Sequence, residues 1–328
     1  MVRRHAASPG PLVSVVVPAR NEERHIGQCV SSIQRTEWPA EQLEILVIDH
    51  FSSDATSTVA HAAGAVVLQH VGGNISSVRN RGLNAANGEF VAYVDADCTV
   101  SRTWLHSAIS LLEHDPRIGA VGGPCLCPEN STWVERSFAP IEPCGKLQEA
   151  RSLATSSFVA RTSVLRQLGY FDESLVSGED DAISARIRER GLILVSTPDC
   201  HIVHYGYPRT WWGVVFKERW HGSNQLESRL SIDANLVLTH LFLFATLALV
   251  PLLALRFAAW SVGGYDAFLG AICAQFLPPL FYALKKLRSR KRDWRLTLPW
   301  LAIGYAYYLG RAWGLLGNYW RRYRVART

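Results

Sequence analysis

The chain has 328 residues, of which 48% are hydrophobic and 19% are charged. This composition excludes a disordered chain and a collagen-like repeat, and the length corresponds to about two domains of ~150 residues each. The net charge of +6 is unevenly distributed, because residues 1–230 carry 21 Lys and Arg against 25 Asp and Glu, whereas residues 231–328 carry 13 against 3. The basic excess is confined to the tail, and we expect no nucleic-acid partner.

Short apolar, β-branched runs alternate with helix-like segments through the first 230 residues. The expected strands are 13–17, 43–48, 65–68, 90–94 and 192–195, and the expected helices include 22–35, 55–63 and 75–86. This alternation is typical of an α/β fold with a mostly parallel central sheet covered on both faces. Ligands of such sheets bind beyond the carboxyl ends of the strands, so we expect functional residues directly after each strand.

Two carboxylates, Asp95 and Asp97, follow the strand expected at 90–94. Residues two apart in an extended chain face the same way, and Mg²⁺ or Mn²⁺ is commonly held by one or two carboxylates together with substrate phosphates. A solvated turn is the alternative for this pair. Polar segments 18–23 and 49–56 follow the first two strands, and their residues are also suited to cap the next helices. Together the three polar strand ends predict one ligand-binding crevice.

The tail contains three long segments of low charge, at 236–255, 267–284 and 298–316. As helices with a rise of 1.5 Å per residue, the first two are long enough to cross a hydrocarbon core of ~30 Å, and we expect them to span the membrane. Residues 285–295 carry seven basic residues against one acid, which favours a cytoplasmic loop and places residues 1–230 on the same side. A buried helical domain is the alternative for the whole tail.

The third segment is interrupted by Arg311 and is rich in Trp and Tyr. These side chains prefer the headgroup level of a membrane, so an interfacial or re-entrant helix stays an alternative to a third span. An amphipathic helix is expected at 209–226, either on the membrane surface or packed on the sheet. The residues predicted close to one face of it are Trp211, Trp212, Val215, Phe216 and Trp220.

The seven cysteines are an odd number and are scattered along the chain. They predict reduced thiols in a cytosolic compartment rather than a disulfide framework. Cys125 and Cys127 have no second matching pair, so we expect no zinc site there. Residues 1–11 lack an apolar segment, and no signal peptide is expected.

Several motifs, taken as an ordered set, resemble those of family 2 glycosyltransferases. The resemblance covers roughly residues 12–220. The motifs are VVVPARNEE at 15–23, DHFSSDAT at 49–56, RNRGL at 79–83, GEFVAYVDAD at 88–97, GYFDE at 169–173 and GED at 178–180.

The resemblance implies a GT-A fold, a nucleotide-sugar donor, a Mg²⁺ or Mn²⁺ cofactor and inversion at the anomeric carbon. It implies that Asp180 is the general base and that Asp97 and Asp95 hold the metal, with His204 as a further ligand. The residues expected to contact the nucleotide are Pro18, Ala19, Glu22, Asp49, Arg79 and Asp95.

Two of these residues have an alternative role. Asp180 lies in the segment 177–180, which also fits a capping box at the start of a helix. His204 is a lone histidine, and such residues are more often structural than metal-binding. The residues expected on the acceptor side, or in a supporting role, are Glu179, Arg219 and Trp220.

The sequence departs from the family pattern at three places. His50 and Phe51 replace the residues common after the second strand, which leaves the nucleobase preference open. Ala182 stands where a second acid is frequent. The segment 216–220 keeps Arg-Trp but lacks the Gln of processive members, which favours transfer of a single sugar.

The sequence therefore predicts a membrane-anchored glycosyltransferase of the exopolysaccharide-biosynthesis type, with its catalytic domain on the cytoplasmic face of the cell membrane. The expected donor is a UDP-sugar, and the expected acceptor is a lipid-linked glycan or polysaccharide precursor, with other polysaccharide-assembly proteins as partners. The alternatives are transfer to a polyprenyl phosphate and a non-catalytic, nucleotide-sugar-binding membrane scaffold. The expected parts are a flexible terminus at 1–10, a catalytic domain at 11–208, an interface helix at 209–230, a membrane region at 231–320 and a basic tail at 321–328.

Overall fold

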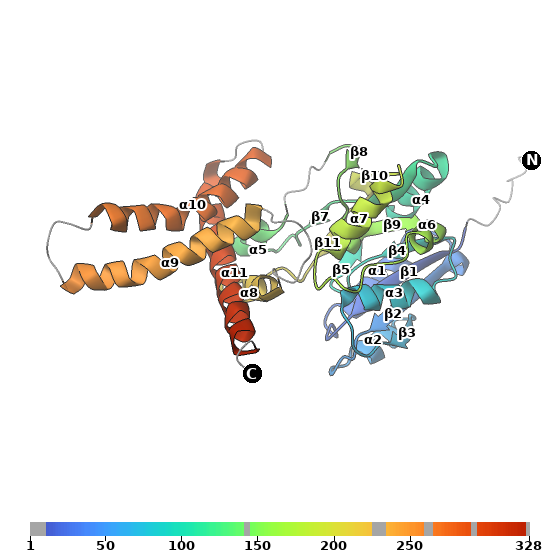
Figure 1. Cartoon of the computed structure of the whole chain (residues 1–328). Helices are drawn as coiled ribbons and strands as arrows, with labels where there is room; N and C mark the ends of the chain where they lie inside the picture. The colour runs from blue at the N-terminus through green and yellow to red at the C-terminus, as the bar shows by residue number, and fades with distance from the viewer. Residues whose placement is uncertain (1–10, 141–144, 225–233, 259–264, 290–293, 326–328) are drawn as a thin grey trace, which may run out of the picture. The chain divides into compact units, whose positions relative to one another are not determined.

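The computed structural model describes residues 11–140, 145–224, 234–258, 265–289 and 294–325. The chain forms two compact units (Figure 1). The first unit comprises Met1–Pro128 and Glu142–Gly206, and the second comprises Glu129–Ile141 and Tyr207–Thr328. The terminus at 1–10, predicted to be flexible, lies outside the described residues.

An eight-stranded sheet forms the centre of the first unit, in the strand order β3-β2-β1-β4-β9-β6-β10-β8. Strands β3, β2, β1 and β4 pair in parallel, as do β6 and β10, whereas β9 is antiparallel to both β4 and β6, and β8 is antiparallel to β10. The strands are β1 (Val13–Ala19), β2 (Leu43–Asp49), β3 (Val66–Gln69), β4 (Phe90–Tyr93), β6 (Ile118–Gly122), β8 (Gln148–Ala150), β9 (Phe158–Arg161) and β10 (Ile193–Ser196). The predicted α/β fold with a mostly parallel sheet is confirmed.

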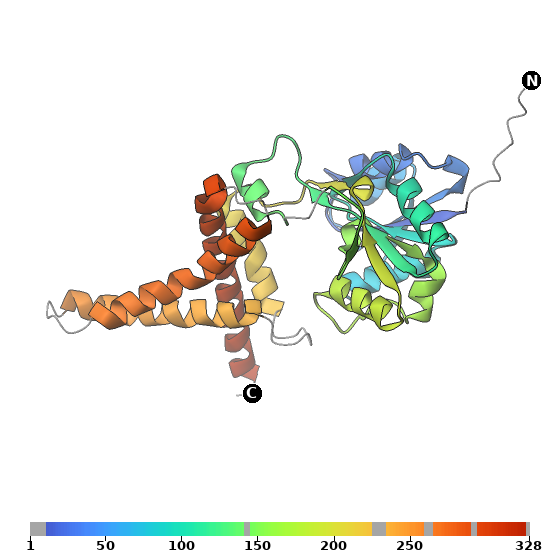
Figure 2. The same ribbon diagram turned by 90° about the horizontal axis from the view of Figure 1, so that it is seen from above.

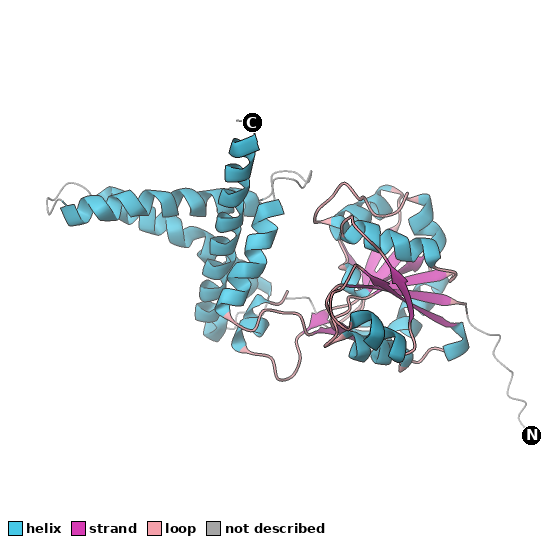
Figure 3. Cartoon of the chain, turned by 90° about the horizontal axis from the view of Figure 1, so that it is seen from below, coloured by secondary structure: helices cyan, strands magenta, loops and turns pink. Residues whose placement is uncertain are grey.

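Helices lie on both faces of this sheet (Figure 3). All seven residues of β1 are buried, as expected for a continuous apolar run in a sheet covered on both sides. Gly82 of the third helix lets that helix approach β1, because a Cβ at this position would overlap the side chain of Val16. The helices are α1 (Ile26–Gln34), α2 (Thr56–Ala62), α3 (Ile75–Ala85), α4 (Trp104–His114), α6 (Thr162–Gln167) and α7 (Glu179–Glu189), with 3₁₀ turns at Ala40–Gln42, Thr155–Ser157 and Pro198–Cys200.

A second, three-stranded sheet lies beside the end of β4. It consists of β5 (Cys98–Val100), β11 (Ile202–His204) and β7 (Cys125–Leu126), with β11 in the centre. The antiparallel register pairs His204 with Cys98. This pairing brings a histidine more than one hundred residues later in the chain next to the Asp95–Asp97 turn.

The second unit consists of helices (Figure 2). They are α5 (Trp133–Phe138), α8 (Trp211–Asn224), α9 (Ala234–Ala258), α10 (Tyr265–Ser289) and α11 (Thr297–Val325), with a 3₁₀ turn at Trp294–Leu296. Two apolar clusters hold them together. The first cluster is Val134, Val214, Val215, Ile303 and Ala306, and the second is Phe242, Leu243, Tyr308, Ala312 and Leu315.

The predicted membrane-spanning segments fold as α9, α10 and α11. Within the described part of the chain, no helix combines the length and the apolar character that a bilayer crossing requires. The predicted spans and the membrane region at 231–320 are therefore not supported. Part of the apolar content that suggested them is buried between helices, as at Phe242 of α9 and Tyr308 and Leu315 of α11.

The predicted amphipathic helix is α8, and its apolar residues do not share one face. Val214 and Val215 are buried in the second unit, whereas Trp212, Phe216 and Trp220 are more than half exposed. Residues 225–230 of the predicted interface segment lie outside the described residues.

Candidate active site

Asp49 ends β2 opposite Ala19 of β1 and is almost fully buried. Its carboxylate accepts hydrogen bonds from Ser57 Oγ at 2.5 Å, from Gln69 Nε2 at 2.8 Å and from the Ser52 side chain. Burial acts to raise the pKa of Asp49, but these hydrogen bonds hold it below its usual value. The carboxylate predicted to contact a nucleobase is therefore ionised and engaged by three side chains of its own chain.

The segments that follow β1 and β2 are joined by reciprocal hydrogen bonds. The Asn21 N–H donates to Ser52 Oγ, and Asn21 Oδ1 accepts from the Ser53 N–H, both at 2.9 Å. The Glu22 N–H donates to Thr56 Oγ1 at 2.7 Å. Asn21 has a φ of 57°, a conformation that Asn tolerates better than most residues. Two of the predicted polar strand ends thus form one fixed surface.

Pro18, Ala19 and Glu22 lie along this surface. Pro18 and Ala19 are buried, and Glu22 is half-buried with its carboxylate 3.1 Å from His25 Nδ1. Burial raises the pKa of Glu22, and the negative charge of Asp97 adds to that shift. The carboxylate of Glu22 is therefore within electrostatic reach of the residue predicted to bind metal.

Arg79 of α3 is the centre of an acid cluster, defined here as Asp95, Glu179 and Asp180. Its side chain is only 5% exposed. Arg79 Nη1 lies 2.7 Å from Glu179 Oε1 and 3.8 Å from Asp180 Oδ1, and Nη2 lies 3.4 Å from Asp95 Oδ1. Burial acts to lower the pKa of Arg79, but the three carboxylates raise it, so the guanidinium remains charged. Arg79 was predicted to contact the nucleotide. In the structure it is the buried counter-ion of the three carboxylates of the acid cluster.

Asp180 lies in the first turn of α7. The residue before the helix is Gly178, with a φ of 84°, and no side chain caps the helix. The capping-box interpretation of residues 177–180 is therefore wrong, since Gly178 has no side chain with which to accept from the backbone. The first turn holds three acids, Glu179, Asp180 and Asp181, where the helix dipole favours negative charge.

The surroundings of Asp180 shift its protonation equilibrium toward neutral pH. Burial raises the pKa of Asp180 to about 7, against the opposing effect of Arg79, and Glu179 raises it further. Thr155 Oγ1 donates a 2.7 Å hydrogen bond to Asp180 Oδ1, which fixes the carboxylate. A carboxylate with a pKa near neutrality is suited to accept and release protons in the physiological range.

Asp97 and His204 form the second group of chemically active side chains. Asp97 Oδ2 lies 3.7 Å from His204 Nε2, and the Tyr205 N–H donates to the Asp97 carbonyl at 2.8 Å. With their oxygen and nitrogen atoms this close together, the two side chains would be able to hold one Mg²⁺ or Mn²⁺ ion. A Cβ at Gly206 would overlap Asp97 Oδ2, so the glycine preserves this space.

A backbone N–H donates a hydrogen bond to the ring of His204. The Gly206 N–H donates to His204 Nδ1 at 3.0 Å, so the proton of the neutral ring lies on Nε2. For His204 to hold a cation through Nε2, the ring proton would have to lie on Nδ1, which then could not accept from the Gly206 N–H.

Cys98 lies within the same group but is a poor ligand for a hard cation. One potential ligand atom each from Asp97, Cys98 and His204 lie within 4.8 Å of one another. Burial raises the pKa of the Cys98 thiol far above its usual value, and Asp95 and Asp97 add to that shift. A protonated thiol does not bind metal, and Mg²⁺ and Mn²⁺ prefer oxygen ligands.

Asp95 connects the acid cluster to Asp97 and His204. Burial raises the pKa of Asp95, Arg79 opposes this shift, Asp97 adds to it, and His204 opposes it. The charges of both groups therefore act on the carboxylate of Asp95. The predicted base and the predicted metal ligands thus influence one another electrostatically.

Of the predicted site residues, Arg219 and Trp220 belong to the second unit. The Arg219 guanidinium lies 4.3 Å from the centre of the Trp313 ring.

Sequence reasoning did not identify Thr155 and Gln69, which orient Asp180 and Asp49. Thr155 lies in a 3₁₀ turn 25 residues before its partner, and no motif connects the two. Gln69 ends β3, so the rule that functional residues follow strands would have found it.

The sequence and the fold are similar to those of several known proteins. Residues 14–168 match the family model described as glycosyl transferase family 2. A relative named glycosyltransferase AglE from Haloferax volcanii is 26% identical over 204 residues, which cover 58% of this chain and 67% of the relative. The chain spans 67%, 56% and 42% of the lengths of three curated relatives that it matches.

Two solved structures have a similar fold. A mannosyltransferase from Pyrobaculum calidifontis in complex with GDP-Man and Mn²⁺ is 21% identical, with a TM-score of 0.58 and coverage of 95% of this chain and 88% of that one. The TarS 1–349 structure from S. aureus in complex with UDP-GlcNAc is 17% identical, with a TM-score of 0.50 and coverage of 92% of both chains. The chain thus has a GT-A-like α/β fold, and its residues 14–168 are similar to glycosyl transferase family 2.

Proposed function

We propose that this chain, whose residues 14–168 match the family model described as glycosyl transferase family 2, transfers one sugar from a UDP-sugar to a lipid-linked glycan or polysaccharide precursor, with inversion at the anomeric carbon. The observation that carries the proposal is the position of Asp180: it lies 3.8 Å from the buried Arg79, in the acid cluster that adjoins Asp97 and His204. This arrangement provides a proton acceptor and a candidate cation site in one electrostatic system.

Asp180 acts as the general base. The acceptor hydroxyl oxygen forms the new bond to the anomeric carbon while the bond from that carbon to the diphosphate breaks. The electron pair of the broken bond leaves with the nucleoside diphosphate, and the hydroxyl proton passes to Asp180. Thr155 keeps the carboxylate oriented for this transfer, and a positioned base contributes typically ~10²- to 10⁴-fold.

The residues that would hold a divalent cation are Asp97, Asp95 and His204. Two carboxylates and an imidazole suit Mn²⁺ or Mg²⁺, and the solved mannosyltransferase of similar fold contains Mn²⁺ with GDP-Man. When bound, such a cation would neutralise negative charge on the diphosphate. Glu22 and the ends of β1 and β2 form the wall along which the nucleotide would bind. Asp49 keeps that wall rigid through its own hydrogen bonds.

The proposed location is the cytoplasmic face of the cell membrane. Exposed aromatic side chains on α8 and α11 support it, because Trp favours the interface between water and lipid: Trp212, Trp220, Trp313 and Trp320 are each 43–59% exposed. The basic excess of residues 231–328 adds attraction to anionic lipids.

The test is a donor panel of UDP-, GDP- and dTDP-sugars with the purified full chain, with and without a chelator. The expected result is turnover of a UDP-sugar that stops with the chelator and returns with Mn²⁺ or Mg²⁺. An acceptor panel that includes lipid-linked glycans and a polyprenyl phosphate defines the acceptor. Release of nucleoside diphosphate from none of the donors with any of the acceptors would overturn the proposal.

A further inference from the structure

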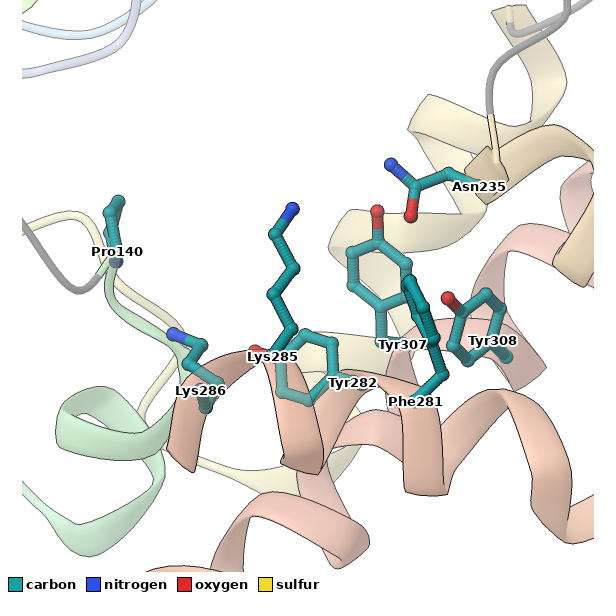
Figure 4. Close-up of a pocket in the computed structure, with 8 residues that line it drawn as sticks. All are labelled: Pro140, Asn235, Phe281, Tyr282, Lys285, Lys286, Tyr307 and Tyr308. Carbon is teal, nitrogen blue, oxygen red and sulfur yellow. The ribbon is translucent and has the colours of Figure 1, made fainter. Parts of the chain in front are cut away.

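A pocket in the second unit has a chemistry unlike that of the acid cluster. It has a volume of about 280 Å³ and is formed by α9, α10, α11 and the residues after α5 (Figure 4). The eight described residues that line it are Pro140, Asn235, Phe281, Tyr282, Lys285, Lys286, Tyr307 and Tyr308.

The pocket is positively charged. Its lining includes Lys285 and Lys286, and no acid is among the eight described lining residues. Glu218, a buried acid whose charge acts on Tyr282 and Tyr307, is paired with Arg311 at 2.8 Å. The charge of Glu218 is therefore compensated by Arg311, and the two lysines of the lining favour an anion.

Hydrogen-bond donors surround the opening. The Lys285 side chain extends into the open space, with Lys286 on one side of it and Asn235 and Tyr307 on the other (Figure 4). Lys286 Nζ donates to the Phe138 carbonyl at 3.2 Å and to the Ala139 carbonyl, which fixes its position without neutralising its charge. Burial raises the pKa of Tyr307, so its hydroxyl stays protonated and able to donate. Ammonium, amide and hydroxyl donors together suit the oxygens of a phosphate.

One wall of the pocket continues into an apolar stripe on α10. Phe281, which lines the pocket, is 45% exposed. Leu277 and Leu284, four residues before it and three after it, are 52% and 47% exposed and lie on the same side of the helix. A ligand with a phosphate in the pocket could therefore place an apolar chain along Leu277, Phe281 and Leu284.

We propose that this pocket binds the phosphate group of a lipid, with the lipid chain on the Leu277–Phe281–Leu284 stripe. The ligand class is an amphiphile with a terminal phosphate monoester. The proposal goes beyond the transfer reaction and does not depend on it, because it is a binding site of the second unit alone.

The competing explanation is that the lysines only stabilise the end of α10. Cations near a helix C-terminus interact favourably with its dipole, and Arg288 lies in the same last turn as Lys286. Arg288 is exposed and does not line the pocket, so it provides a control with the same charge loss on the same helix.

The experiment measures binding of monomeric, short-chain phosphatidic acid to the purified full chain by titration calorimetry at physiological salt. Inorganic phosphate and short-chain phosphatidylcholine are the parallel ligands. We expect phosphatidic acid to bind at least about tenfold more tightly than either one, because it alone combines an accessible phosphate with an apolar chain. Lys285→Gln, in the middle of the opening, and Asn235→Ala, on one side of it, should each weaken binding about tenfold, since the first removes a positive charge and the second removes a hydrogen-bond donor to a charged group.

Arg288→Gln should leave the affinity within about twofold, because Arg288 does not line the pocket and an exposed charge outside it is largely screened at this salt. Equal losses for Lys285→Gln and Arg288→Gln would overturn the proposal in favour of non-specific attraction. Equal affinities for inorganic phosphate and phosphatidic acid would overturn the lipid assignment. Both outcomes are measured as binding affinities, so loss of the transferase activity would not affect them.

Discussion

Arg79 Nη1 donates a 2.7 Å hydrogen bond to Glu179 Oε1, although the two residues lie 100 positions apart in the chain. The same guanidinium lies 3.4 Å from Asp95 and 3.8 Å from Asp180. One buried cation therefore connects α3, the end of β4 and the start of α7. The protonation of the proposed base, Asp180, depends on this cation.

Asp180→Asn should lower the rate of transfer by ~10²- to 10⁴-fold, because the amide cannot accept the hydroxyl proton. Donor binding should persist, since Asp97 and His204 are unchanged. Turnover and donor affinity are measured on the same preparation. Asp181→Asn is the matched control: Asp181 is the next residue, is exposed and accepts a 2.6 Å hydrogen bond from Ser152. An Asp180→Asn enzyme as fast as the Asp181→Asn enzyme would refute the assignment of the base.

The rate should depend on pH with an inflection near 7. Burial raises the pKa of Asp180 to about 7, so the carboxylate is protonated and inactive as a base below that pH and ionised above it. We expect kcat/KM, measured at saturating Mn²⁺, to fall about tenfold per pH unit below 7 and to level off above it. The residual activity of Asp180→Asn should lack this inflection. A flat profile between pH 5 and 8 (about the range in which an unperturbed carboxylate is fully ionised) would contradict the role of Asp180.

Arg79→Leu should destabilise the first unit, because it leaves three carboxylates without their buried counter-ion. Removal of one partner of a buried charge pair costs roughly 3–5 kcal/mol in the free energy of unfolding, which denaturant titration measures. Arg79→Lys keeps the positive charge and should lose less stability than Arg79→Leu. In that variant the pH inflection should move upward, because a single ammonium opposes the raised pKa of Asp180 less well than the guanidinium. Arg117, whose bridge to Asp115 is exposed, provides the control: Arg117→Gln should alter neither stability nor the pH profile appreciably.

Asp97→Ala and His204→Ala should raise the Mn²⁺ concentration needed for half-maximal activity at least about tenfold, since each removes a proposed ligand. Metal binding is measured directly by the paramagnetic signal of Mn²⁺, independently of turnover. Cys98→Ser should leave the Mn²⁺ affinity almost unchanged, because the buried thiol is protonated. If Cys98→Ser alone reduced Mn²⁺ affinity, the assignment of the ligands would have to be abandoned.

Gly206→Ala should weaken Mn²⁺ binding while the chain still folds, because the new methyl group overlaps Asp97 Oδ2 and displaces the carboxylate. Gly270→Ala is the control, since a Cβ there meets no atom within 4 Å and Ala favours the helix. Circular dichroism verifies folding of both variants. Unchanged Mn²⁺ affinity in Gly206→Ala would show that Asp97 is not held in a fixed place.

The sequence predicted the strands that lead to the site because they are continuous apolar runs with polar ends. Val13–Ala19, Leu43–Asp49 and Phe90–Tyr93 are each within two residues of their expected bounds. The antiparallel strand Phe158–Arg161 was not predicted, since a run of three apolar residues that ends in an arginine is too short to show a distinctive period.

The candidate site was predictable in its residue types and less so in its contacts. Motif order identified Asp97 and Asp180, but the role of Arg79 as a counter-ion depends on Glu179, and no local pattern links residues so far apart. The expected spans failed for a related reason. Hydropathy records that Phe242 and Leu315 are apolar, but it does not record whether lipid or another helix covers them.

The segment Glu129–Ile141 belongs to the second unit although it interrupts the sequence of the first. Val134 of this segment is 3% exposed and packs with Val214 and Ile303. A protease that cut the backbone only after Gly206 would release fragments of which neither contains all the residues of the second unit. Gene fusion or domain shuffling at that point would likewise separate Val134 from the residues against which it packs. The two units should therefore be inherited together.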